Sequence, residues 1–107
     1  MDESTIIKEL TELLKAVRIK PGMYIGKKSL TRLRAFIDGY FYALYKLNGK
    51  QEYLCFIPEF QDWIADRYEI RSTHGWSEII NFFSQDEGEA FDTFYELLDE
   101  FLLEKRS

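Results

Sequence analysis

Lys20-Pro21-Gly22-Met23-Tyr24-Ile25-Gly26-Lys27-Lys28-Ser29 is the stretch that decides how the first half of the chain folds. Pro21 lacks a backbone donor and biases the residue before it away from the α region. Gly22 and Gly26 can supply the positive φ of tight turns. The three residues between these glycines are apolar and are expected to fold back onto the core. We therefore predict an ordered loop here, the one part of the first half that is not helical.

Amphipathic patterns on both sides of this loop predict long helices. Residues 4–18 carry one apolar stripe at helical spacing, and Pro21 is expected to stop that helix. Ser29 is a suitable N-cap for a second helix, which runs to about Leu47 and ends at Gly49 through an αL cap. Gly39 lies inside this helix and suggests close approach of another backbone. The apolar stripe of the second helix consists of Leu30, Leu33, Phe36, Ile37, Tyr40, Phe41, Leu44, Tyr45 and Leu47.

The second half predicts three more helices. Pro58 opens one of them at its first turn, where proline is tolerated. A short helix follows a turn at residues 70–75, and a capping box from Ser84 to Glu87 starts the last helix, which runs to about Glu104. Residues 52–57 fit either one short strand or an extended connector. The buried faces are Phe60, Trp63, Ile64 and Tyr68; Trp76, Ile79, Ile80 and Phe83; and Ala90, Phe91, Phe94, Leu97, Leu98, Phe101 and Leu102.

Composition places the chain among small globular proteins. Its 107 residues are 46% apolar and 17% aromatic, which suffices for one core and argues against disorder. The sequence has no apolar run of about 18 residues, and no apolar segment follows its acidic N-terminus. One histidine and one cysteine, Cys55, do not make a transition-metal site. We predict a single all-α domain over residues 1–107 of about five helices, cytoplasmic, without a cofactor and without a membrane contact.

Charge is distributed unevenly along the chain. Residues 1–57 carry ten basic and six acidic side chains, a net charge of +4. Residues 58–107 carry four basic and thirteen acidic ones, a net charge of −9, so the whole chain has −5. An acidic surface of this kind accelerates encounter with a basic protein. The alternative interpretation is that these charges belong to an ordinary solvent-exposed helix face, which is the usual role of a run of charged residues. We expect the acidic residues of the third and last helices to contact a partner. These candidate partner-binding residues are Asp62, Asp66, Asp86, Glu89, Asp92 and Glu96.

The basic loop offers an alternative site. Cations around a glycine-containing turn, ahead of a helix start at Ser29, could hold a phosphate, and Tyr24 adds a ring for stacking. The alternative interpretation is that these cations solvate the loop or neutralise the acidic half of the same molecule. The glycines match no phosphate-binding motif, and an isoelectric point of about 4.9 argues against nucleic acid. The alternative function is a nucleotide- or nucleic-acid-binding module, whose ligand-binding residues would be Lys20, Tyr24, Lys27, Lys28, Arg32 and Arg34.

His74, beside Gly75 and Trp76, is the remaining candidate for chemistry. An imidazole can act as a general base near neutral pH, but it needs a nucleophile or an orienting acid. Its sequence neighbours supply only Ser72, Thr73 and Ser77. We interpret His74 as a turn residue that bonds the backbone, and we predict that the chain is not an enzyme.

Two resemblances to known families can be stated. Residues 14–26, with Lys20-Pro21-Gly22-Met23-Tyr24-Ile25-Gly26, resemble the start of the ATPase domain of the gyrase B subunit. That family also needs an Asp-x-Gly-x-Gly motif and an α/β sandwich, and this chain has neither the motif nor the length. The resemblance therefore implies a similar loop, and ATP binding is not carried over to this chain.

The chain as a whole resembles small bacterial immunity and antitoxin proteins of polymorphic toxin systems, including those encoded beside LXG-type toxins. Its size, its acidic second half and its aromatic content carry this resemblance, together with His74-Gly75-Trp76 and Phe60-x-x-Trp63-Ile64. The resemblance implies a stoichiometric binder that masks a basic toxin domain. The sequence leaves the oligomeric state open, and a dimer through residues 23–25 is one alternative.

Overall fold

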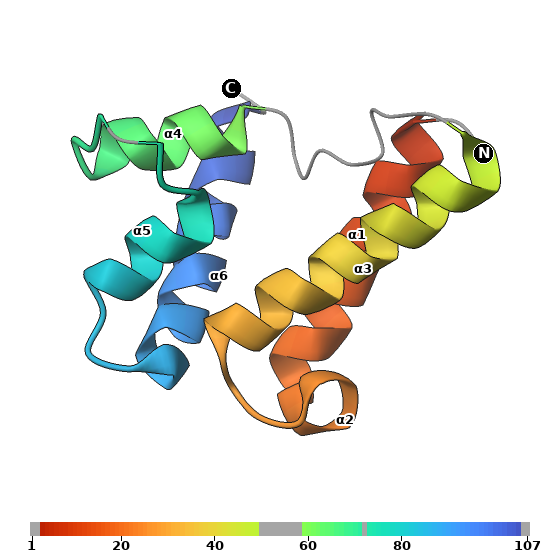
Figure 1. The fold of residues 1–107 in the computed structure, drawn as a ribbon, viewed down its shortest axis with the longest axis horizontal. Coiled ribbons are helices and arrows are strands. Elements are labelled where there is room, and N and C mark those ends of the chain that lie inside the picture. Colours follow the sequence, from red (N-terminus) through yellow and green to blue (C-terminus); the bar gives the residue numbers. More distant parts are fainter. Residues whose placement is uncertain (1–2, 50–58, 72, 106–107) are drawn as a thin grey trace.

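The computed structural model describes residues 3–49, 59–71 and 73–105, and this part of the chain forms six α-helices and no strand (Figure 1). The all-α prediction is confirmed. The segment 52–57, Cys55 and Pro58 lie outside the described residues, so the predictions made for them stay predictions. The helices are α1 (Glu3–Ile19), α2 (Pro21–Ile25), α3 (Leu30–Asn48), α4 (Phe60–Arg67), α5 (Trp76–Phe82) and α6 (Glu87–Lys105).

The segment predicted to be a loop contains a helix, α2, so that prediction is wrong. Pro21 opens α2, where the missing N–H costs nothing because the first N–H groups of a helix have no intrahelical partner. Gly22 therefore needs no special backbone freedom, whereas Gly26 ends the turn at a φ of +88°. Ile25 is buried, but Met23 is 71% exposed, so only part of the apolar triplet folds onto the core.

Both ends of α3 follow the prediction. The Ser29 hydroxyl accepts a hydrogen bond from the backbone N–H of Arg32, and Gly49 closes the helix in the αL conformation at a φ of +71°. Two expectations inside α3 are wrong. A Cβ added at Gly39 would meet nothing within 4 Å, so no other segment in the described part of the chain approaches it, and Leu47 is 83% exposed.

α6 connects the helices of the bundle and buries seven of its own side chains. The hydroxyl of Tyr95 donates to the main-chain carbonyl of Leu14 in α1 over 2.7 Å. Phe94 stacks on Trp76 of α5, with ring centroids 5.0 Å apart. Phe60 of α4 meets Phe94 edge to face at 6.0 Å. Each such ring contributes about 1.5–3 kcal/mol when fully buried, so this aromatic cluster is a large part of the core that joins α4, α5 and α6.

The capping box predicted at Ser84 and Glu87 is wrong. The hydroxyl of Ser84 donates to the carbonyl of Ile80 over 2.7 Å, which closes the end of α5. Asp86 caps α6 instead, because its carboxylate accepts from the backbone N–H of Glu89 over 2.8 Å.

Glu87 does not cap α6 and instead links the start of α6 to the start of α3 through hydrogen bonds. Its carboxylate accepts from the backbone N–H of Thr31 over 2.8 Å, from the Thr31 hydroxyl over 2.6 Å and from the Ser29 hydroxyl over 3.1 Å. Burial raises the pKa of Glu87, but the hydrogen bonds from Thr31, Ser29 and the backbone outweigh burial, and the pKa is lowered overall. The charged form of Glu87 therefore stabilises the fold.

Candidate functional site

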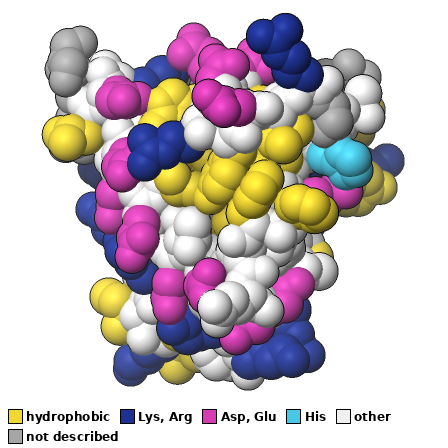
Figure 2. All heavy atoms as spheres, turned by 90° about the vertical axis from the view of Figure 1, so that its left-hand side faces the viewer, with side chains coloured by type: hydrophobic (Ala, Val, Ile, Leu, Met, Phe, Trp, Pro, Cys, Tyr) yellow, Lys and Arg dark blue, Asp and Glu magenta, His cyan; other side chains and the backbone are white. Residues whose placement is uncertain are grey.

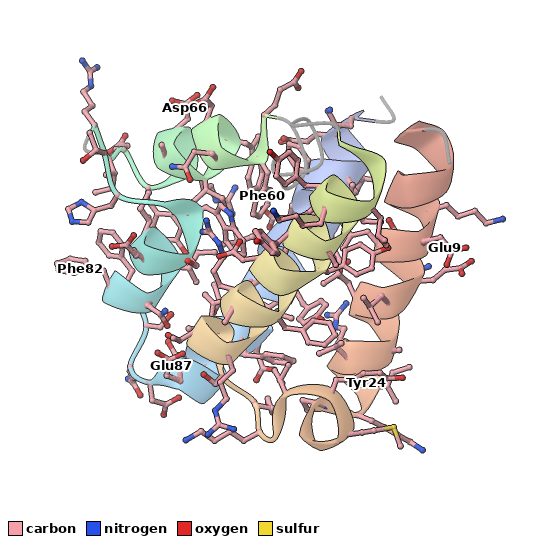
Figure 3. All side chains as sticks on the ribbon, turned by 45° about the vertical axis from the view of Figure 1, so that its right-hand side comes forward. Glu9, Tyr24, Phe60, Asp66, Phe82 and Glu87 are labelled. Carbon is pink, nitrogen blue, oxygen red and sulfur yellow. The ribbon has the colours of Figure 1, made fainter. Side chains whose placement is uncertain are left out.

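The predicted acidic contact residues do not form one surface. Asp62 and Asp66 lie one helical turn apart on α4, whereas Asp86 and Glu89 lie at the start of α6. In Figure 3, Asp66 lies near the top of the molecule and Glu87, the neighbour of Asp86, lies in its lower part. A partner would have to extend along α6 from its start toward α4 to touch all of them.

Several of these acids already have partners inside the molecule. Asp92 accepts from Lys28 over 2.7 Å, Asp86 caps α6, and Glu89 accepts from the backbone N–H of Gln85 over 3.4 Å. Among the described residues, the side chains of Asp62, Asp66 and Glu96 have no hydrogen bond or ion pair. The uncompensated charge that a partner could use is thus concentrated on α4 and midway along α6.

The alternative cluster of cations is also partly used by the fold. Lys28 pairs with Asp92, and Arg32 donates to the carbonyl of Ile25 over 3.0 Å. Arg34 pairs with its neighbour Asp38 over 3.0 Å, donates to Ser77 and lies 5.1 Å above the ring of Trp76. The half-buried ring of Tyr24 meets Phe36 edge to face. Only Lys20 and Lys27 of the six have side chains without a partner in the described part of the chain, so this cluster serves mainly the fold.

The structure instead reveals an apolar groove of about 730 Å³ between the end of α4 and the outer side of α5. Figure 2 faces this side and shows hydrophobic side chains gathered at its centre, with the single histidine of the chain at their edge. We call it the α4–α5 groove. It is lined by Glu69, Ile70, Arg71, His74, Glu78, Ile79, Asn81, Phe82 and Phe83.

Aromatic rings form one wall of the groove. Phe83 stacks on Tyr68 with centroids 5.0 Å apart, and Phe82 meets Phe83 edge to face at 5.0 Å. Phe83 is 51% exposed, contrary to the burial predicted for it, and Phe82 is 80% exposed and points away from the core in Figure 3. Burial raises the pKa of Tyr68; the charge of Arg67 opposes that rise, and the carboxylate of Glu100 adds to it.

The cause of this exposure lies in the length of α5. A helix of seven residues buries one stripe, and Trp76, Ile79 and Ile80 already fill it. Phe82 falls outside the stripe, and Phe83 caps the helix at its end. The signal in the sequence is the run Ile79-Ile80-Asn81-Phe82-Phe83, which has more apolar residues than one helix face can bury.

Hydrogen bonds of Gln61 fix the loop beside the groove. Its amide nitrogen donates to the carbonyl of His74 over 3.1 Å, and its amide oxygen accepts from the backbone N–H of Trp76 over 2.6 Å. The loop that carries His74 is therefore held to α4 by a side chain that the sequence did not single out, and the groove is largely preformed.

The groove has an acidic rim. Glu69 and Glu78 line it together with Arg71, and Asp66 lines the adjoining hollow. Glu69 occupies the αL conformation at a φ of +56°, and the helix end closes through bonds from Glu69 N–H to the Asp66 carbonyl and from Ile70 N–H to the Ala65 carbonyl. Glycine is the usual residue at this position, because αL costs other residues about 1–2 kcal/mol. The carboxylate of Glu69 therefore stands at the rim on a strained backbone.

The described residues contain no group of three or more histidine, cysteine or carboxylate side chains placed to hold a metal ion. Among them there is also no helix long and apolar enough to cross a membrane. Comparison of the chain with known protein families, with characterised proteins and with solved structures found no match.

Proposed function

We propose that this chain is a stoichiometric binding protein that docks an apolar, basic segment of a partner protein in the α4–α5 groove. The observation that carries the proposal is the groove itself, with Phe82 80% exposed at its edge. Its volume of about 730 Å³ lies in the range of preformed ligand sites, and aromatic side chains are the usual anchors of protein interfaces.

The charges at the rim favour a basic segment. Three carboxylates, those of Asp66, Glu69 and Glu78, stand against the single guanidinium of Arg71. Lysine or arginine beside the apolar anchors of the partner would meet these carboxylates, and the net charge of −9 on residues 58–107 would steer the approach.

The biological role that we propose for this binding is masking of a basic toxin domain, as in the immunity and antitoxin proteins that the chain resembles. What supports this role is the small helical domain, the acidic second half and the open apolar groove. In such a role the chain needs no chemistry of its own, because covering the partner is sufficient.

A defined peptide tests the binding site. The probe is a synthetic amphipathic helix of about five turns, with leucine and phenylalanine on one face and lysine on the other. Fluorescence anisotropy should show saturable binding at one peptide per chain, and Phe82→Ala should weaken binding about tenfold, or about 1.4 kcal/mol. Phe82 is 80% exposed, so this substitution should leave the stability of the fold almost unchanged.

Leu47→Ala is the matched control, because Leu47 is equally exposed, at 83%, and lies outside the groove. It should bind the peptide like the wild type. A peptide with glutamate in place of lysine should bind less well, and a scrambled peptide without an apolar face should not saturate. Equal affinities of Phe82→Ala and the wild type would refute the groove as the docking site.

A further inference from the structure

A second exposed apolar surface lies where α1 meets α2, and we call it the α1–α2 corner. Ile19 is 76% exposed and Met23 is 71% exposed. Lys20 and Lys27 lie within the same nine residues of chain, and neither ammonium group has a partner in the described part of the structure. The corner thus combines apolar side chains with unpaired positive charge. These are the properties of the apolar, basic segment that we propose the α4–α5 groove binds.

The corner is held in shape by the fold. Ile19 falls outside the buried stripe of α1, which ends at Val17, and the single turn of α2 buries Ile25 alone. Arg32 donates to the carbonyl of Ile25 over 3.0 Å and fixes α2 against α3. A surface fixed in this way loses little conformational entropy when it binds.

We propose that the α1–α2 corner of one copy docks in the α4–α5 groove of a second copy. The inference rests on the proposed function, since it uses the same groove, and it adds a regulation of that groove. Met23 and Ile19 would enter beside Phe82, while Lys20 and Lys27 would face Asp66 and Glu69. Opposite charges around two apolar surfaces favour this pairing over groove-to-groove contact, in which like charges would meet.

The arrangement of the helices determines the kind of assembly. α2 lies on the opposite side of α6 from α4 and α5 in both ribbon views (Figures 1 and 3). The corner of a molecule therefore faces away from its own groove, and the contact is heterologous, so it leads to open chains or rings. At high protein concentration the groove is covered by a second copy, and a basic partner has to compete for it.

Complementation between two variants tests this pairing. Met23→Glu keeps the groove and loses the corner, while Phe82→Glu keeps the corner and loses the groove. Analytical ultracentrifugation should show concentration-dependent association of the wild type that weakens as salt is added, and each variant alone should associate at least about tenfold more weakly. An equimolar mixture of the two variants should form a heterodimer that stops at two copies. Leu47→Glu, a change of the same charge at another exposed apolar residue, should associate like the wild type.

A wild type that stays monomeric up to about 1 mM, or a mixture that stays monomeric, would overturn the pairing. So would a Met23→Glu variant that associates like the wild type, because a contact without the corner would then be responsible. The peptide assay separates the two proposals. Met23→Glu should bind the basic peptide as tightly as dilute wild type. If it does, and the mixture of Met23→Glu with Phe82→Glu stays monomeric, only the self-pairing is wrong. If neither the wild type nor Met23→Glu binds the peptide, the proposed function is wrong.

Discussion

Glu69→Gly should stabilise the fold and weaken partner binding at the same time. Glu69 holds the αL conformation at a φ of +56° at the end of α4, and the relief of that strain is worth about 1–2 kcal/mol. Glycine also gives the unfolded chain more freedom, which costs about 0.4–1 kcal/mol. The net gain in the free energy of unfolding is about 0.5–1 kcal/mol, which should raise the melting temperature by about 2–6 °C in a domain of this size.

The same substitution removes the rim carboxylate and should therefore lower the affinity for the basic peptide. An exposed charge of this kind contributes about 0.3–1 kcal/mol, so the affinity for the basic peptide should fall about two- to fivefold. Urea denaturation measures the first effect and peptide anisotropy the second. Glu69→Gln is the matched control, because it removes the same charge and keeps a side chain in αL.

The two variants should therefore differ in stability and agree in affinity. If Glu69→Gly is no more stable than Glu69→Gln, the backbone strain at this position is not present in solution. If both variants bind the peptide like the wild type, the rim carboxylate takes no part in docking, and the electrostatic half of the proposed function is wrong.

Other substitutions test the fold that holds the groove. Glu87→Gln should lower the free energy of unfolding by about 1 kcal/mol at neutral pH. Because the pKa of Glu87 is lowered in the folded state, this contribution is complete above the ordinary carboxyl pKa and is lost as the pH falls through the lowered value, so the urea midpoints of variant and wild type should converge in acid. The control Glu96→Gln removes a carboxylate without a partner among the described residues and should change stability little at any pH. Tyr95→Phe should lose about 1 kcal/mol in urea denaturation, since its hydroxyl is buried and donates to a carbonyl of α1; an unchanged midpoint would contradict that bond. Gly26→Ala should destabilise by more than about 1 kcal/mol in thermal denaturation, because φ is +88° and the added methyl would collide with the Arg32 guanidinium; a neutral result would mean that this turn relaxes.

The features that the sequence predicted are those set by local spacing. The stripes of α1, α3 and α6 follow from helical periodicity, and the caps at Ser29 and Gly49 follow from residue types with one strong local preference. The local pattern does not predict α2, because a proline that ends one helix also fits the first position of the next. Local rules alone do not decide between these two roles.

A long-range hydrogen bond explains the error at the predicted capping box. Glu87 fits a capping box by its spacing from Ser84, yet it bonds Thr31, which is 56 positions away in the sequence. Tyr95 is absent from the predicted apolar stripe of the last helix, yet it is 3% exposed and its hydroxyl donates to a carbonyl 81 positions away. A side chain with a strong hydrogen-bonding group takes the best partner that the fold brings near, and sequence spacing does not contain that information.

The sequence pattern does not predict the α4–α5 groove, because the groove depends on how two helices pack against each other. Periodicity assigns apolar residues to a core, and it placed Phe83 there. Phe83 instead stacks on Tyr68 at the edge of the core, and Phe82 extends from it into solvent. Only the position of α5 relative to α4 shows that these rings form one wall of a groove.

The acidic second half has two physical roles on two sides of α6. On the side toward α1 and α2, Asp92 and Asp99 pair with Lys28 and Arg18, and such exposed pairs contribute at most about 1 kcal/mol each. The pair with Asp92 neutralises Lys28, one of the cations that suggested a phosphate site. On the side of α4, Asp62 and Asp66 have no such partner among the described residues. Asp66 lines the hollow beside the apolar groove, so under the proposed function a basic partner would be attracted to the face where its apolar side chains can be buried.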